Sequence, residues 1–322
     1  MVNNKILKST FFILSFSRSG STVLGQKLNN HSKVKVINES WFFTLLAKFR
    51  WKTLNITKQK YILHQLFKNN SKLKEKVVFR GSSEHISPNA LFTHTYNTKA
   101  SFIGEKTPSN TFIYNYIRTL YPESKFIFLK RHPLAITSSY FSRWYSENYD
   151  DKFIINSVAT IRAYFNAYNK INKNEILEIS YENLVEYPEK TLSKLSDYIG
   201  FDFEEKMLYK SEKIFEFSAD EKYHLHAHQP LIKSRTYRFK STFNSHQLIE
   251  LSYLLRNEII SLGYEQEILI KPTKRLQNLD KKINKIISPN QIMTRRFISL
   301  VKGNLSYNLF RIKRIFLGYK LL

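Results

Sequence analysis

The sequence has no cysteine, which excludes disulfide bonds and thiolate metal sites and fits a reducing compartment. It is also poor in acidic residues, with 26 Asp and Glu against 51 Lys and Arg, and carries a formal net charge of +25. No apolar run is long enough for a membrane span or a signal peptide, because TFFILSF (10–16) is soon followed by Arg18. We therefore expect a cytoplasmic protein that attracts anionic molecules.

The positive charge is unevenly distributed along the 322 residues. Residues 271–322 contain 13 Lys and Arg and a single acidic residue, Asp280. No Gly/Ser/Pro-rich linker interrupts the preceding part of the chain. We predict one domain over residues 1–270, followed by a basic extension over 271–322.

The end of the extension has the pattern of an amphipathic basic helix. Leu305, Leu309, Ile312 and Phe316 recur at helical spacing, and basic residues occupy other positions around the turn. Two interpretations stay open. The helix contacts an anionic membrane surface, which would be the inner face of the membrane, or it packs on the domain with a solvated basic face.

Strand-like apolar runs alternate with helical patterns, which indicates an α/β fold with a parallel sheet flanked by helices. The predicted strands span 10–16, 34–38, 101–106, 125–131 and 175–180. The predicted helices span 22–30, 57–75, 110–121, 153–172, 188–199 and 244–262, with two more beginning at Trp41 and Pro133. Ligands of such sheets bind at the carboxyl ends of the strands, so we expect functional residues directly after strands.

Polar or charged residues do follow four of the predicted strands. They are the segment SRSGST (17–22), Glu39, Lys106 and Arg131, in strand order. Because the carboxyl ends of parallel strands meet at one edge of a sheet, we expect these residues to define one face.

The SRSGST loop has the composition of an anion-binding turn between a strand and a helix. Backbone N–H groups of residues 19–22 and the helix dipole suit a phosphate-like group, Gly20 allows close approach, and Arg18 adds a bidentate cation. The loop lacks the G-x-x-x-x-G-K-[ST] pattern of P-loop nucleoside triphosphatases. Taken alone, the loop is equally compatible with an anion site and with an ordinary strand-to-helix connection whose serine caps the helix.

A second basic cluster follows the strand 125–131. Arg131 ends this strand, Ser139 lies two turns along the next helix on a similar side, and Arg143 follows one turn later. The alternative is a solvated helix start. That alternative explains Arg131 less well, because a cation directly after an apolar strand sits at the ligand edge of the sheet.

Three segments, SFSRSGSTVLGQKLNNHSKV, IGEKTPSN and KFIFLKRHPLAITSSYF, resemble in this order the sulfotransferase family that uses 3′-phosphoadenosine 5′-phosphosulfate (PAPS). The resemblance continues through EILEISYENLVEYPEKTLSKLSDYIGF and KSRTYRFKSTFNSHQL, and covers about residues 10–265. It implies a P-loop-like α/β fold and sulfuryl transfer from PAPS, with no metal and no covalent intermediate.

The resemblance also assigns roles to individual residues. The residues that match its 5′-phosphosulfate loop are Arg18, Ser19, Gly20, Ser21 and Thr22. Arg131 and Ser139 match its 3′-phosphate pair. Glu39 and Lys106 fall where carbohydrate and tyrosyl-protein branches keep a catalytic glutamate and a lysine near the sulfuryl group.

The chain departs from the family pattern at three places. Arg18 stands where cytosolic small-molecule members use lysine, and His132 stands where an acidic residue is frequent. Tyr237 replaces the usual glycine of the closing loop, which leaves Ser234 and Arg238 as candidate cofactor contacts only.

Sulfuryl transfer depends on positioning and on charge stabilisation at the transferred group, as phosphoryl transfer does. We predict Glu39 as the general base for the acceptor hydroxyl, with a surface glutamate at a helix start as the alternative. Arg18 and Lys106 would stabilise charge on the sulfuryl group, although Lys106 has the alternative of a solvated lysine at a strand end. If Glu39 is not the base, the next candidates are His132 and the histidines at 224, 226 and 228.

The histidines of HLHAHQP (224–230) have alternating spacing but no neighbouring acidic residue or cysteine. We interpret His224, His226 and His228 as part of a polar loop and predict no metal site.

The predicted function is transfer of a sulfuryl group from PAPS to a hydroxyl on a sugar or glycan. One alternative is a nucleotide-dependent phosphoryl transferase on a related fold, disfavoured by the missing GK[ST]. Another is a basic anion- or nucleic-acid-binding protein. It is disfavoured because no binding module is recognisable, so nucleic acid is not an expected partner.

Overall fold

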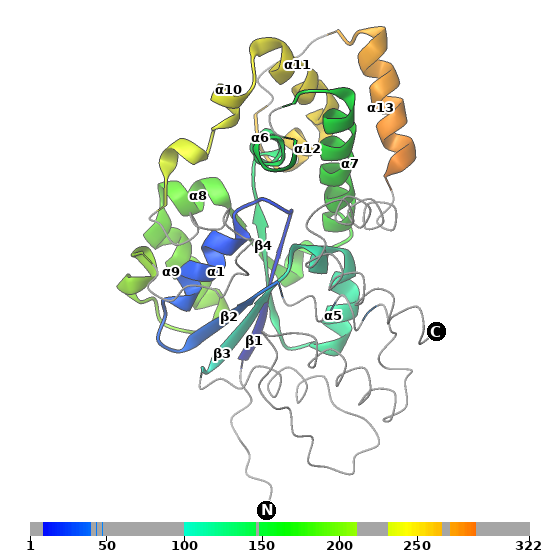
Figure 1. Cartoon of the computed structure of the whole chain (residues 1–322). Coiled ribbons are helices and arrows are strands. Elements are labelled where there is room, and N and C mark those ends of the chain that lie inside the picture. The colour runs from blue at the N-terminus through cyan, green and yellow to red at the C-terminus, as the bar shows by residue number, and fades with distance from the viewer. Residues whose placement is uncertain are drawn as a thin grey trace, which may run out of the picture.

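The fold is built on a five-stranded parallel sheet (Figure 1). The computed structural model describes residues 9–39, 43, 47, 100–145, 148–210, 231–265 and 271–287. Its strands are β1 (Ser9–Ser15), β2 (Val34–Asn38), β3 (Phe102–Lys106), β4 (Lys125–Lys130) and β5 (Ile176–Ser180). They are arranged in the order β2-β3-β1-β4-β5, and all neighbours are parallel. The predicted fold class and the five predicted strands are confirmed.

Helices cover both faces of the sheet, which explains why its central strands are continuous apolar runs. Alternate residues of β1 enter two separate hydrophobic cores, Phe12 and Leu14 one of them, Phe11 and Ile13 the other. All four side chains are fully buried. This alternation follows from the two-residue period of a strand.

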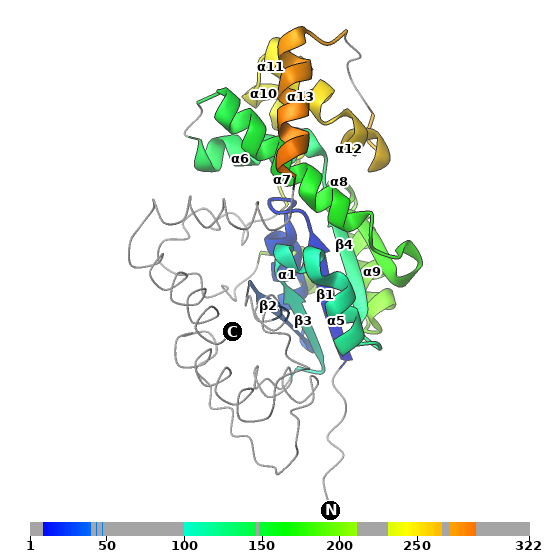
Figure 2. The same ribbon diagram turned by 90° about the vertical axis from the view of Figure 1, so that its right-hand side faces the viewer.

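The helices form two layers on the sheet and a third group beyond its carboxyl edge. One face carries α1 (Ser21–Asn29), α8 (Tyr181–Glu186) and α9 (Pro188–Ile199). The other face carries α5 (Tyr114–Leu120) and α7 (Asp151–Tyr168) (Figure 2). The third group lies where the strands end and contains α6 (Pro133–Trp144), α10 (Phe239–Thr242), α11 (Ser245–Leu254), α12 (Arg256–Ser261) and α13 (Lys274–Ile286). Short 3₁₀ helices are η3 (Pro108–Ile113), η4 (Lys173–Glu175), η5 (Glu205–Leu208) and η7 (Lys233–Arg235).

Two predicted helices are each divided in the structure. The segment predicted as 110–121 forms η3 and then α5, and the hydroxyl of Thr111 bonds both the N–H (3.1 Å) and the C=O (3.0 Å) of Ser15, which ties η3 to the end of β1. The segment predicted as 244–262 is interrupted at Leu255. Its predicted start is confirmed, because Asn244 and Gln247 form a capping box. The predicted helices at 41 and 57–75 and the 305–320 pattern lie outside the described residues, apart from two isolated positions near 41.

The first helix of the predicted extension, α13, packs into the main core. Leu276, Leu279 and Ile283 lie on one face of this helix and are at most 5% exposed. They join the same hydrophobic cluster as the residues of α7 and α11. Residues 274–286 therefore share a core with the residues that precede them. None of the described helices is long and apolar enough to cross a membrane.

Candidate active site

The residues singled out after the strands lie together at the carboxyl edge of the sheet. In the sheet register, Lys106 at the end of β3 pairs with Ile13 of β1 and with Asn38 of β2, directly before Glu39. Ser15 pairs with Leu129 of β4, so the SRSGST loop and Arg131 leave neighbouring strands at the same level. The structure thus brings four separate segments of the chain to one place.

At Gly20 the SRSGST loop has a left-handed backbone and no room for a side chain. Gly20 caps α1 with φ +92°, and a Cβ atom at this position would lie 2.3 Å from Cδ2 of Tyr181. Ser19 donates from its hydroxyl to the carbonyl of Phe16 at 2.7 Å and is fully buried. No described side chain caps the N-terminus of α1, so the helix cap is Gly20 and not a serine. The first N–H groups of α1 are therefore available to an anion.

Glu39 and Lys106 form an ion pair beside this helix N-terminus. The Lys106 ammonium lies 3.0 Å from Oε1 of Glu39 and donates to the Thr22 hydroxyl, also at 3.0 Å. The Lys106 side chain is fully buried, whereas that of Glu39 is 30% exposed. The backbone N–H of Glu39 also donates to the carbonyl of Lys106 at 2.7 Å. The carboxylate is thus reachable from solvent, while the ammonium is fixed inside the site.

Backbone strain within the described chain is concentrated at this site. Arg18 (φ +71°) and Glu39 (φ +48°) are its two non-glycine residues with a left-handed backbone. Such conformations cost about 1–3 kcal/mol and persist where the surroundings impose them. Both residues had been selected from the sequence as catalytic.

The second basic cluster joins the first through Arg18. Its Nε donates to the hydroxyl of Ser139 at 3.1 Å. Arg131 donates from Nη1 to the carbonyl of Arg18 at 3.1 Å and from Nη2 to the carbonyl of Arg235 at 2.8 Å. Its guanidinium also lies over the ring of Tyr181, 4.3 Å from the centroid. Nε of Arg131 is buried and has no hydrogen-bond partner among the described residues.

These arginines concentrate positive charge in a poorly solvated place. Burial is the main cause that lowers the pKa of Arg18, and the charges of Arg143 and Arg131 act in the same direction. Burial also lowers the pKa of Arg131, and Arg235 contributes to the decrease. Because guanidinium groups stay protonated in proteins, the two arginines keep their positive charges in this poorly solvated place, where an anion would balance them.

The structure does not bring every predicted residue into this cluster. Ser234 lies in η7 and Arg238 at the start of α10; both are exposed, and neither side chain hydrogen-bonds a described residue of the site. Their cofactor contact stays a prediction. His224, His226 and His228 lie outside the described residues.

His132 is built into the helix start instead of facing the ion pair. Its Nδ1 accepts the N–H of Leu134 at 3.2 Å, and its ring packs 4.8 Å from the ring of Phe239 and 4.9 Å from that of Tyr264. The residue is 4% exposed. This environment suits a helix cap and disfavours His132 as the alternative base.

Two residues at the start of α8, Tyr181 and Glu182, contact the site, and the sequence analysis did not select them. The ring of Tyr181 lies between Gly20 and Arg131, and Glu182 accepts the N–H of His132 at 3.0 Å and the hydroxyl of Tyr264 at 2.7 Å. Burial, followed by the charge of Glu182, raises the pKa of Tyr264, which keeps its hydroxyl a donor. The signal in the sequence was the YE pair directly after the strand at 175–180.

A hollow of about 440 Å³ lies at the opposite edge of the sheet, where the strands begin. His31, Lys33, Phe102 and Glu204 are among the residues that line it. Nε2 of His31 donates to the carbonyl of Asp202 at 2.9 Å and lies 3.3 Å from Oε1 of Glu204. The hollow is lined by both acidic and basic residues, so its charge does not favour an anion. It is separate from the cluster at the carboxyl ends of the strands.

Two curated proteins are similar to part of this chain. Of two curated relatives, an uncharacterized protein of Aquifex aeolicus is 25% identical over 224 residues, covering 64% of this chain and 28% of the relative. Nodulation protein NoeE of Sinorhizobium fredii is 28% identical over 140 residues, covering 41% of this chain and 31% of NoeE. The matched part thus spans less than a third of the length of each relative.

The sulfotransferase domain from the curacin biosynthetic pathway shares the fold, with a TM-score of 0.50 and 18% identity over 80% of this chain and 99% of that domain. The profile of the Sulfotransferase family matches residues 10–205, which include the SRSGST loop, Glu39, Lys106, Arg131 and Ser139. Because this match extends over more than half of the sequence, the chain belongs to the sulfotransferase family.

Proposed function

We propose that the protein transfers a sulfuryl group from PAPS to an acceptor hydroxyl. The observation that carries the proposal is the pairing of two cationic clusters at one sheet edge, Lys106 with the N-terminus of α1 and Arg131 with Ser139. PAPS carries an anionic group at each end, a 5′-phosphosulfate and a 3′-phosphate. The N–H groups of the SRSGST loop suit the first, and the orphaned Nε of Arg131 suits the second.

In this proposal the acceptor oxygen forms a bond to sulfur as the bond from sulfur to the bridging oxygen breaks. The leaving 3′-phosphoadenosine 5′-phosphate (PAP) takes the electron pair of the broken bond. The acceptor proton moves to the carboxylate of Glu39. Lys106 and the N–H groups at the start of α1 stabilise the negative charge on the transferring and leaving oxygens.

The ion pair of Glu39 and Lys106 connects donor binding to proton transfer. The sulfuryl oxygens would compete with Glu39 for the Lys106 ammonium, which now lies 3.0 Å from the carboxylate. As Lys106 turns to the sulfuryl group, the carboxylate loses its cation and becomes more basic. Glu39 thereby becomes an effective base once the donor is in place.

The proposed acceptor is a hydroxyl on a sugar or glycan. Support comes from the position of Glu39, which resembles that of the carbohydrate and tyrosyl-protein branches. Trp144 adds support, because it is 52% exposed, stacks on Tyr140 and lies 6.0 Å from Arg18. An exposed indole beside the reacting group offers an apolar face to a sugar ring.

We also propose a cytoplasmic location, and the suggested membrane contact of residues 305–320 stays a prediction outside the described residues. Family membership disfavours the kinase and nucleic-acid-binding alternatives.

Thermal unfolding with different nucleotides tests the donor. PAP without Mg²⁺ should raise the melting temperature, by mass action on the folded state. A protein that responds only to ATP with Mg²⁺ would instead be a phosphoryl transferase.

A further inference from the structure

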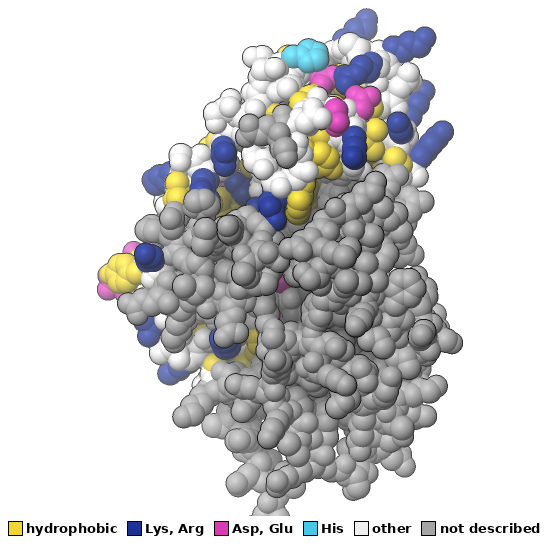
Figure 3. All heavy atoms as spheres, in the orientation of Figure 1, with side chains coloured by type: hydrophobic (Ala, Val, Ile, Leu, Met, Phe, Trp, Pro, Cys, Tyr) yellow, Lys and Arg dark blue, Asp and Glu magenta, His cyan; other side chains and the backbone are white. Residues whose placement is uncertain are grey.

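The outward face of α13 carries lysines and no carboxylate. Lys274, Lys281, Lys282 and Lys285 are exposed, and none forms an ion pair with a described residue. Lys274, Lys281 and Lys285 follow each other at seven and four residues, so they form one stripe along the helix. In Figure 3, dark-blue side chains line the upper right edge of the molecule, where Figure 1 places α13.

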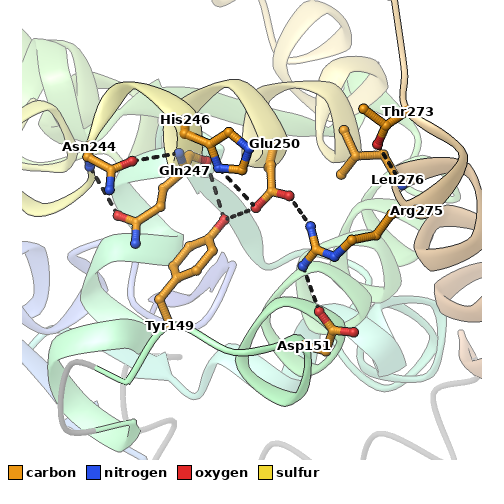
Figure 4. Close-up of polar contacts among 9 residues, drawn as sticks. All are labelled: Tyr149, Asp151, Asn244, His246, Gln247, Glu250, Thr273, Arg275 and Leu276. Atoms are coloured by element: carbon orange, nitrogen blue, oxygen red, sulfur yellow. Dashed lines mark hydrogen bonds and ion pairs between the residues drawn. The ribbon is translucent and has the colours of Figure 1, made fainter.

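The ion pairs that hold α13 on the domain are made by Asp280 and Arg275, not by the lysines. Asp280, the acidic residue of α13, pairs with Arg162 at 2.6 Å and with Arg256 at 3.3 Å. Arg275 pairs with Glu250 and, at 2.7 Å, with Asp151 of α7 (Figure 4). Asp280, Glu250 and Asp151 thus pair with arginines, and the lysine face has no counterion among the described residues.

This sorting of charges is not a general property of the surface. On α9, exposed Glu189 and Asp197 are interspersed with exposed Lys190 and Lys194. On α13, Lys281 and Lys285 lie one turn apart, where like charges repel and weaken a helix. On α13, by contrast, the single acid, Asp280, lies against the arginines of neighbouring helices, and the four lysines are exposed.

We propose that this lysine face, consisting of Lys274, Lys281, Lys282 and Lys285, docks on an anionic lipid bilayer. Lysine ammonium groups are point charges that attract headgroup phosphates without a fixed geometry, and each adds to binding at an anionic surface. The chain beyond α13 favours a bilayer over a soluble polyanion. Residues 288–322 add seven Lys and Arg, no acid and the apolar spacing at 305–316, which a bilayer interior can accept. The proposal is independent of the proposed sulfuryl transfer.

Vesicle co-sedimentation of the full chain tests this surface. The test variant is Lys274→Gln/Lys281→Gln/Lys282→Gln/Lys285→Gln. The control variant, Lys35→Gln/Lys170→Gln/Lys190→Gln/Lys194→Gln, removes the same charge from exposed lysines on other elements. Vesicles contain phosphatidylglycerol with phosphatidylcholine, or phosphatidylcholine alone. Because one lysine near an anionic surface contributes about fivefold, the test variant should bind phosphatidylglycerol vesicles roughly 10²–10³-fold more weakly.

The control variant should bind close to wild type, and added salt should release the wild-type protein. Equal binding of the test variant and wild type would overturn the proposal, as would equal losses in both variants. If wild type does not bind vesicles but binds heparin, and the test variant loses heparin binding, the partner is a soluble polyanion and not a bilayer. Unchanged melting temperature and PAP affinity establish that the test variant is folded.

Discussion

The ammonium of Lys106 lies 3.0 Å from the carboxylate of Glu39, at the ends of the neighbouring strands β3 and β2. The ammonium is fully buried and the carboxylate is partly exposed, so the two groups face different partners. Lys106 donates to Thr22 in the first turn of α1, whose free N–H groups suit an anion, and the carboxylate of Glu39 is open to solvent.

Glu39→Gln should separate chemistry from donor binding. Glutamine keeps the shape of the side chain but cannot take the acceptor proton, so turnover should fall by about 10²–10⁴. PAP affinity, measured by calorimetry, should stay within a small factor or rise, because a negative charge near an anion is removed. Glu189→Gln on the exposed surface of α9 is the control and should change neither. A parallel loss of turnover and PAP affinity would mean that Glu39 is structural.

Arg131→Ala should weaken PAP binding by roughly ten- to hundredfold, since a charged hydrogen-bond partner contributes about 1.5–3 kcal/mol. Arg131→Lys should recover only part of this affinity, because an ammonium cannot replace the planar fork that reaches two carbonyls. Arg118→Ala, which removes a one-third exposed arginine (33%) paired with Glu175, is the control. Calorimetric affinities equal to wild type in both Arg131 variants would remove Arg131 from the donor site.

Gly20→Ala and Gly200→Ala should differ in their effect on the site. Both glycines have a left-handed backbone, so each alanine should cost about 1–3 kcal/mol of stability. The Cβ at position 20 would also meet the ring of Tyr181 at 2.3 Å, whereas nothing lies within 4 Å of the Cβ at position 200. Gly20→Ala should therefore weaken PAP binding, and Gly200→Ala should not. Equal PAP affinities in the two variants would argue against a donor site at this loop.

Two truncations should distinguish α13 from the chain that follows it. Removal of 288–322 keeps α13 and its core contacts, so it should lower the melting temperature less than removal of 271–322 does. Removal of 271–322 also removes Leu276, Leu279 and Ile283 from the core. Each such side chain contributes about 1.5–3 kcal/mol, so the melting temperature should fall by more than about 10 °C. Circular dichroism melts measure both, and identical curves would show that α13 adds nothing to the core.

Local patterns in the sequence determined the strands and the polar residues at their ends. Short apolar runs between helical patterns located β1 to β5 within about a residue, and the residue types of SRSGST indicated an anion site. Glu39, Lys106 and Arg131 were found by one rule, that ligands of a parallel sheet bind where its strands end. These features depend on neighbours in the chain, which is why the sequence by itself reveals them.

Only the tertiary structure decided which of these groups touch. Arg18 reaches Ser139 across 121 residues, and Arg131 reaches the carbonyl of Arg235 across 104. Such contacts depend on the strand order β2-β3-β1-β4-β5 and on helix packing, which no local pattern encodes. The same reason explains why His132, a candidate base in the sequence, is a buried helix cap, and why the charges of α13 separate into an inner and an outer face.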